Sequence, residues 1–179
     1  MINQGIVQYE LHLRYYVHAQ RYAGFPYAFQ TVGSSMAVRA GAYQKQGGMN
    51  TRKAGEDFYF LHRIIPLGNY AEINSTRVIP SPRVSDRVPF GTGKAMEDYL
   101  KSNRSELMTY NPATFGDLKI LFERSAEFFG LGMPAIEKLY YTLPESIQEF
   151  IGKPDFMNKI EELDRQSRDE GQFIKHFFS

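Results

Sequence analysis

Two adjacent carboxylates, Glu56 and Asp57, follow Gly55 at the start of a predicted helix. A carboxylate at such a junction can face a cleft while the helix behind it stays packed. It can act as a general base if it comes within ~2.6–3.2 Å of a hydroxyl group. The glycines upstream, Gly47 and Gly48, leave room for a substrate. A structural role stays open, because acidic residues in a first turn gain ~0.3–1 kcal/mol from the helix dipole.

A second group of chemistry-bearing residues is basic. Arg77, Arg83, Arg87 and Lys94 lie within eighteen positions and are opposed only by Asp86. Guanidinium groups bind phosphate in a bidentate manner, and the glycines of this segment let backbone N–H groups approach a ligand. The segment therefore predicts a contact with a diphosphate or a phosphorylated acceptor. The alternative is a surface connection whose arginines pair with the acidic C-terminal half.

Other chemistries find little support. The four histidines share no metal-ligand spacing, and we expect them to be ordinary core or surface residues. The absence of cysteine excludes a disulfide scaffold, thiol catalysis and a Cys-ligated zinc site. No cofactor site is expected in this chain.

Hydrophobic periodicity then gives the elements that must position these residues. Helices are predicted over 4–21, 40–46 and 56–67, and short strands over 27–32, 36–39, 70–73 and 77–79. Residues 80–94 are predicted as a loop. After residue 95 the pattern is helical over 95–107, 114–130, 134–142, 144–151, 154–165 and 169–178. The expected fold is α/β tending to mainly α, with domains at 1–94 and 95–179.

Charge divides at the same boundary. Residues 1–94 hold 11 basic and 5 acidic residues, a net +6, whereas residues 95–179 hold 10 and 15, a net −5. The net charge of +1 argues against a nucleic-acid partner. No apolar run approaches the ~18 residues that a membrane span needs, so a cytoplasmic location is expected. Basic and aromatic residues leave contact with the inner membrane face open. The aromatic C-terminus, ending in Phe177 and Phe178, leaves a homo-oligomer open.

The spacing of the small and acidic residues resembles that of a known enzyme family. The run Gly33-Ser34-Ser35-Met36-Ala37-Val38-Arg39, then Tyr43, Gly47-Gly48 and Gly55-Glu56-Asp57-Phe58, is similar to the acceptor-side half of family 2 glycosyltransferases with the GT-A fold. The resemblance covers about residues 22–94. The segment from Arg83 to Gly93 also resembles a bacterial subset of this family.

The resemblance implies an inverting sugar transfer in cell-envelope or polysaccharide synthesis. In this family the acidic pair supplies the base, here Asp57, which deprotonates the acceptor hydroxyl for attack on the anomeric carbon of a nucleotide-sugar. Glu56 would orient the acceptor or support Asp57. The partners implied are a nucleotide-sugar donor and a saccharide or lipid-linked acceptor, with Arg83, Arg87, Lys94 and Arg77 as substrate or phosphate contacts.

The family's nucleotide-binding half has no counterpart here. That half carries an Asp-x-Asp motif, which holds Mg²⁺ or Mn²⁺ against the donor diphosphate in the complete enzyme. The only acidic-x-acidic match, Glu162-Leu163-Asp164, lies in a charged helical segment typical of a solvated face. We therefore expect a C-terminal fragment, inactive alone. The alternative is a non-catalytic helical interaction module with a basic, anion-binding loop.

Overall fold

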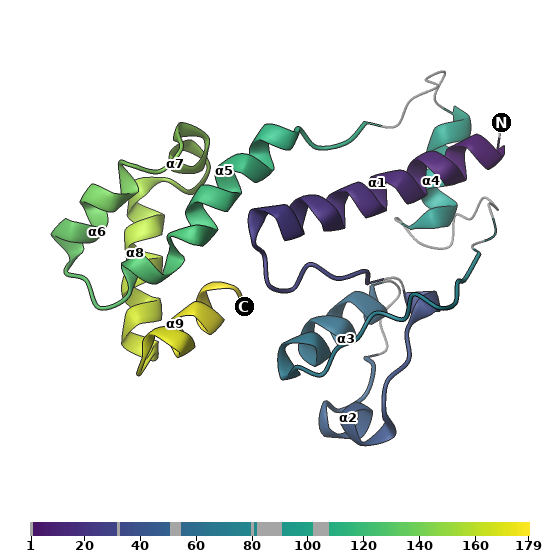
Figure 1. Ribbon diagram of the computed structural model, residues 1–179, viewed down its shortest axis with the longest axis horizontal. Coiled ribbons are helices and arrows are strands. Elements are labelled where there is room, and N and C mark those ends of the chain that lie inside the picture. Colours follow the sequence, from purple (N-terminus) through teal and green to yellow (C-terminus); the bar gives the residue numbers. More distant parts are fainter. Residues whose placement is uncertain (1, 32, 51–54, 80, 82–90, 102–107) are drawn as a thin grey trace. The chain divides into compact units, whose positions relative to one another are not determined.

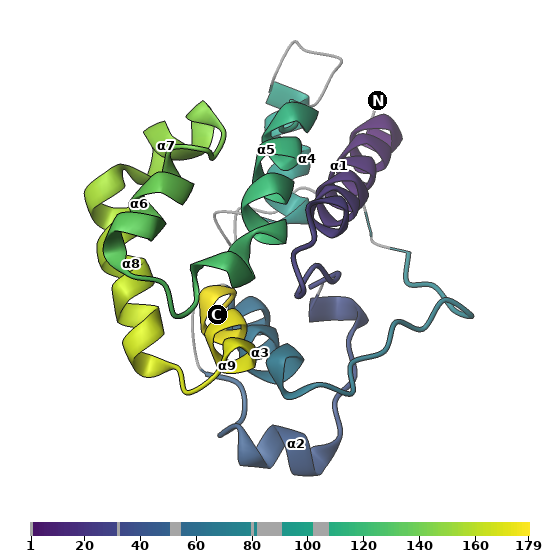
Figure 2. The same ribbon diagram turned by 60° about the vertical axis from the view of Figure 1, so that its left-hand side comes forward.

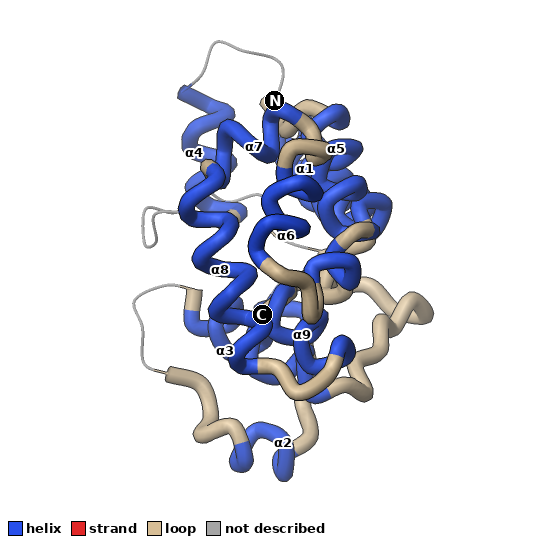
Figure 3. The backbone as a smooth tube through the Cα atoms, turned by 90° about the vertical axis from the view of Figure 1, so that its left-hand side faces the viewer, coloured by secondary structure: helices blue, strands red, loops and turns tan. Residues whose placement is uncertain are grey.

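The chain is mainly α-helical. The computed structural model describes residues 2–31, 33–50, 55–79, 81, 91–101 and 108–179. These residues form nine α-helices and three short 3-10 helices, with no strand among them (Figures 1 and 3). The α-helices are α1 (Ile2–Ala23), α2 (Ala40–Lys45), α3 (Glu56–Ile64), α4 (Thr92–Lys101), α5 (Pro112–Glu123), α6 (Met133–Tyr140), α7 (Glu145–Ile151), α8 (Lys153–Gln166) and α9 (Glu170–Phe177). The 3-10 helices are η1 (Gly33–Ser35), η2 (Ile65–Leu67) and η3 (Ser125–Phe128).

Each predicted helix is confirmed over most of its described length. The helix predicted over 114–130 is interrupted, because α5 ends at Glu123 and η3 follows it, and the helix predicted over 56–67 continues beyond Ile64 only as η2. Their ends coincide with the residues that cap or stop helices. The Asn111 side chain accepts a hydrogen bond from the Ala113 N–H ahead of α5, and Pro112 occupies the first helical position. Asp169 caps α9 in the same way, through the Gln172 N–H. The loop prediction over 80–94 extends three residues too far, because α4 already begins at Thr92.

The predicted strands are wrong within the described residues. A strand needs a neighbour to pair its backbone groups, and side chains take that place near residues 27–31. The Arg21 guanidinium donates to the Ala28 carbonyl at 2.9 Å, and the Tyr70 hydroxyl donates to the Gln30 carbonyl at 3.3 Å. The segments 36–39 and 70–73 likewise have no ladder, and residues 71–79 are exposed along their whole length. Their β-branched residues have no pleated surface to pack on.

The chain divides into two compact units. The N-terminal unit comprises residues 1–15 and 29–109, and the C-terminal unit comprises residues 16–28 and 110–179. Helix α1 contributes residues to both. The domain boundary predicted near residue 94 stays a prediction.

The C-terminal unit is a small helical bundle with a continuous core. Helix α6 packs on α8, α8 on α9, and α5 on α7 (Figures 1 and 2). The core is made of buried side chains from every one of these elements, namely Leu121, Phe128, Ile136, Tyr140, Leu143, Ile147, Phe156, Ile160, Leu163 and Phe173. The terminal aromatics belong to this packing, because Phe173 is fully buried and the Phe178 ring contacts the rings of Phe25 and Phe122.

The N-terminal unit holds the residues of the predicted site. Phe60 and Leu61 of α3 are buried, as are Ile65 of η2 and Met96 of α4. Helix α3 therefore presents one apolar face to a core and leaves its first turn and opposite face accessible. No described helix has the length and apolar character to cross a membrane.

Candidate active site

The Asp57 carboxylate joins two parts of the chain that are far apart in sequence. Its Oδ2 accepts a hydrogen bond from the Gly33 N–H at 3.1 Å, across 24 residues. Its Oδ1 accepts from the Phe58 N–H at 2.8 Å. Both oxygens are thus oriented by backbone donors, and each retains a further lone pair for a substrate hydroxyl. The carboxylate is half-buried in the first turn of α3.

Gly33 has no room for a side chain. A Cβ built on it would lie 2.1 Å from Asp57 Oδ2 and 2.7 Å from Asp57 Cβ. These contacts are far shorter than van der Waals distance, so any larger residue would displace the carboxylate. The glycine of the predicted motif is therefore required by the acid that follows it in the same motif.

A second contact ties the glycine-glycine turn to the same helix. Arg63, in the last turn of α3, donates to the carbonyls of Gln46 at 3.0 Å and Gly48 at 2.9 Å. The Tyr43 ring packs on the Phe60 ring at 5.3 Å. Gly48 has a φ of +68°, and a Cβ there would lie 3.0 Å from the Tyr43 ring. Helix α3 thus fixes both glycine segments of the motif.

Glu56 lies beside Asp57 and is half-buried. Gly55 precedes it with a φ of +74° and is buried, so the chain turns sharply into α3. No side chain caps this helix. The two carboxylates occupy its first turn, where the helix dipole favours negative charge.

The basic residues are not gathered at Asp57. Lys94 belongs to the first turn of α4 and pairs with Asp98 at 2.7 Å and Glu97 at 3.2 Å, both on its own helix. The hydrogen bond to Asp98 is the main reason why the pKa of Lys94 is raised, with that to Glu97 second. Arg77 is exposed in the segment before residue 80. Arg83 and Arg87 lie outside the described residues.

Metal-binding potential is low in the described part of the chain. No group of three or more His, Asp or Glu side chains there is placed to hold a metal ion. Glu162 pairs with Lys159 at 3.0 Å, and Asp164 accepts from the Gly130 N–H at 2.8 Å. Asp164 therefore joins α8 to the turn at Gly130, and Glu162 forms an accessible ion pair along α8 itself.

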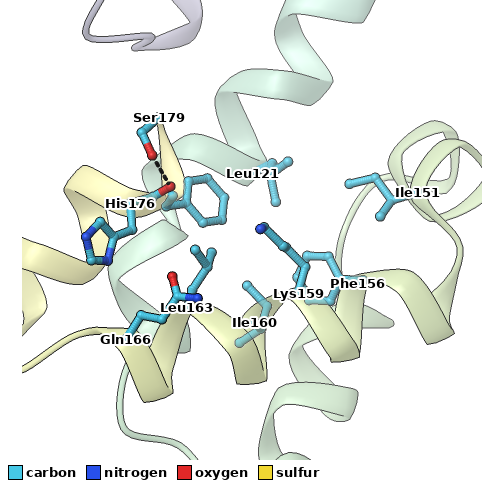
Figure 4. Close-up of a pocket in the computed structure, with 10 residues that line it drawn as sticks. Leu121, Ile151, Phe156, Lys159, Ile160, Leu163, Gln166, His176 and Ser179 are labelled. Carbon is cyan, nitrogen blue, oxygen red and sulfur yellow. Dashed lines mark hydrogen bonds between the residues drawn. The ribbon is translucent and has the colours of Figure 1, made fainter. Parts of the chain in front are cut away.

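The C-terminal unit contains a cavity of about 240 Å³ (Figure 4). Its walls are largely apolar, with Leu121, Phe156 and Ile160 among them, and Lys159 and His176 contribute polar groups. The ammonium of Lys159 pairs with Glu162, and His176 Nδ1 lies 3.1 Å from the Ser167 hydroxyl. The volume falls below the roughly 300–1,000 Å³ of typical ligand pockets. None of the residues predicted to act on a substrate lines it.

Sequence reasoning missed two features of α3. Arg63 was not singled out, although a basic residue in a last turn is a common cap of neighbouring carbonyls. The contact between Phe58 and His62, whose rings lie 4.8 Å apart, was also missed. Their spacing could have indicated this contact. Phe58 and His62 are four positions apart and therefore share one face of the helix, which is not the face of Phe60 and Leu61.

Comparisons with protein-family models, with curated proteins and with solved structures found no match to this chain. The resemblance to family 2 glycosyltransferases stays a prediction from the sequence.

Proposed function

We propose that the chain is the acceptor-side part of an inverting glycosyltransferase, in which Asp57 is the general base. The carboxylate would take the proton of an acceptor hydroxyl as that oxygen attacks the anomeric carbon of a nucleotide-sugar. The bond between that carbon and the diphosphate would break, and the nucleoside diphosphate would leave. Glu56, next to it in the first turn, would orient the acceptor.

One observation carries this proposal. The Gly33 N–H and the Asp57 carboxylate lie 3.1 Å apart, although 24 residues separate them. The resemblance pairs a small-residue segment with an acidic pair, and the described residues bring those two segments into contact. Since only glycine fits at position 33, residue type and geometry support the same pairing.

The remaining parts of the reaction require residues beyond this chain. A nucleotide-binding half would carry the donor and a Mg²⁺ or Mn²⁺ ion that neutralises the diphosphate. Its strands would offer backbone ladder partners to segments 36–39 and 77–79. Arg77, Arg83 and Arg87 would contact phosphate, whereas Lys94 would first have to leave Asp98 and Glu97. The reaction would take place in the cytoplasm, at or near the inner membrane face.

The test is sugar transfer by the chain joined to its nucleotide-binding half. Nucleoside diphosphate release is measured with a panel of UDP-, GDP- and dTDP-sugars, and the anomeric configuration of the product is read by ¹H NMR. We expect release with one class of donor and an inverted linkage. Retention of configuration, or no transfer with any donor and acceptor, would contradict the proposal.

The second candidate is a non-catalytic helical interaction module. It is favoured by the finding that the described residues form helices and no strand, with a self-contained core in the C-terminal unit. In that case Asp57 would only join α3 to η1. Binding of an anionic partner through Arg83 and Arg87, without any transferase activity, would support this candidate.

A further inference from the structure

The cavity of the C-terminal unit has an apolar floor that is part of the core itself (Figure 4). Phe156, Ile160 and Leu163 of α8 line it, and all three are buried. Leu121 of α5 and Phe177 of α9 also line it. Protein cores leave few voids larger than one water molecule, whereas this cavity of about 240 Å³ has room for roughly eight. It is therefore an apolar space that the side chains of this unit do not fill.

One charged side chain lies at the mouth of this cavity. Lys159 of α8 is 60% exposed, and Figure 4 shows its ammonium directed toward the space between the lining side chains. Its hydrogen bond to Glu162 Oε2, at 3.0 Å, uses one of its three N–H donors. The other two have no hydrogen-bond partner in the described part of the chain. An exposed ion pair of this kind is weak, so it leaves the ammonium available to a second anion.

The other polar side chains of the rim are held by the chain itself. The Ser167 hydroxyl donates to the Leu163 carbonyl at 2.7 Å, so it accepts the hydrogen of His176 Nδ1 at 3.1 Å. The Gln166 amide donates to Glu162 at 3.1 Å. No Asp or Glu is among the described lining residues. The mouth of the cavity therefore carries a positive charge, and Lys159 is the group that can anchor a ligand.

An apolar cavity with a cation at its mouth suits a molecule that has an apolar body and an anionic end. We propose that this cavity binds a small amphipathic anion of the class of medium-chain carboxylates. The hydrocarbon chain would lie against Phe156 and Ile160, and the carboxylate would accept hydrogen bonds from Lys159 Nζ. At roughly 30 Å³ for each methylene-sized group, about eight carbon atoms fit. The inference concerns the C-terminal unit alone and does not depend on the proposed sugar transfer.

The test is an NMR titration of the ¹⁵N-labelled 179-residue chain with butanoate, hexanoate and octanoate. We expect saturable shifts of the α8 and α9 amides, with affinity rising about threefold to fourfold for each added methylene up to octanoate. 1-Octanol and octylamine have the same chain without a negative charge. Octylamine should bind most weakly of the eight-carbon compounds, because its ammonium is repelled by that of Lys159.

A substitution at the mouth separates the contribution of charge from that of the apolar walls. Lys159→Met removes the ammonium and keeps a long apolar side chain at an exposed position. It should weaken octanoate binding about twofold to fivefold and leave 1-octanol binding unchanged. The matched control is Lys138→Met, because Lys138 is an exposed lysine of α6 that does not line the cavity. This control should leave octanoate binding unchanged.

Several results would overturn the inference. These are the absence of saturable shifts with octanoate, an affinity that does not depend on chain length, equal binding of octanoate and octylamine, and unchanged octanoate binding by Lys159→Met. A second copy of the chain is the competing occupant, since Phe150 on α7 is 89% exposed. Self-association that Phe150→Ala abolishes, without octanoate binding, would assign the cavity to that ring and also overturn the inference.

Discussion

At the scale of single residues, Gly33 and Asp57 depend on each other. The glycine supplies an N–H to one carboxylate oxygen and leaves the space that this oxygen occupies. The fold thus holds this carboxylate in one position, as its proposed role of general base would require.

The dependence predicts the effect of adding one methyl group. Gly33→Ala should displace the Asp57 carboxylate, break its hydrogen bond to the residue-33 N–H, and destabilise the N-terminal unit by about 1–3 kcal/mol. Urea unfolding measures the stability, and the amide chemical shift of residue 33 reports the hydrogen bond.

The control for that variant is Gly41→Ala. Gly41 lies inside α2 and has open space around its Cβ position, so alanine there should be neutral or stabilise by about 0.5–1 kcal/mol. Equal stabilities of Gly33→Ala and the wild type would show that the close approach at Gly33 has no energetic weight.

The sequence indicated which residues could have a functional role, but it did not predict their contacts. Asp57 and Gly33 were identified by their types and spacing, but a contact across 24 residues depends on the path of the chain between them. The ion pairs of Lys94 were missed although they are local. Glu97 and Asp98 were visible at helical spacing, yet residues 92–94 were predicted as loop, so Lys94 was expected to face a ligand.

At the scale of elements, α3 organises the N-terminal unit around the site. Its first turn holds the acids, its buried face carries Phe60 and Leu61, and its last turn binds the glycine-glycine turn through Arg63. Loss of any one of these contacts should disturb the others, because they share one rigid helix.

Arg63 offers a test of that arrangement. Arg63→Ala would leave the Gln46 and Gly48 carbonyls without their donor and should cost about 1–3 kcal/mol. Arg63→Lys should recover only part of that loss, since an ammonium lacks the planar fork that reaches both carbonyls. Urea unfolding of the two variants measures the difference, and full recovery by lysine would contradict the bidentate role.

Helix α4 carries a charge pattern that depends on pH. The pKa of Glu97 is lowered, chiefly by its hydrogen bond to Lys101 and then by that to Lys94. Because the pKa of Glu97 is lower in the folded state than in the unfolded state, the pairing of Glu97 with the two lysines stabilises α4. This stabilisation is fully present at pH values above the pKa of Glu97 in the unfolded chain. The stabilisation is lost as the pH falls through the folded pKa.

The variant Lys101→Gln should raise the pKa of Glu97 toward its ordinary value. The carboxyl carbon shift of Glu97, followed by NMR from pH 7 to pH 2, measures the change. Lys119→Gln, which removes the partner of Glu123 on α5, should leave the Glu97 titration unmoved. A Glu97 titration that is the same in Lys101→Gln and the wild type would refute this account of the helix.

Helices were predictable and strands were not, for one physical reason. A helix pairs its backbone groups within itself, so periodicity and caps such as Asn111 determine where it forms. A strand pairs with a distant segment. Segments 36–39 and 77–79 have suitable residue types, but no described neighbour offers them a ladder.

At the scale of the whole molecule, two units with different charge share the chain. The N-terminal unit has twelve basic and eight acidic residues, a net +4, and the C-terminal unit has nine and twelve, a net −3. The sequence division at residue 94 also gave a positive N-terminal part and a negative C-terminal part. The two divisions therefore agree in the sign of the charge, although they assign some segments differently. The excess of positive charge lies in the unit for which a phosphate-bearing substrate is proposed.

The core of the C-terminal unit predicts a sharp contrast between two phenylalanines. Phe173 is fully buried, and Phe173→Ala should destabilise this unit by about 3–5 kcal/mol. Phe150 is 89% exposed, and Phe150→Ala should change its stability by no more than about 0.5 kcal/mol. Amide hydrogen exchange over α5 to α9 measures both effects. Similar protection in the two variants would contradict the core described for this unit.

The central claim is that Asp57 is the base of a sugar transfer. Its most direct test is the turnover of Asp57→Asn in the chain joined to its nucleotide-binding half, at saturating donor and with donor affinity measured alongside. The matched control is Asp155→Asn, because Asp155 is also an acid in a first helical turn, that of α8. We predict that Asp57→Asn loses about 10²–10⁴-fold in turnover with donor affinity unchanged, and that the control stays active. Turnover of Asp57→Asn within about twofold of the wild type would contradict the claim.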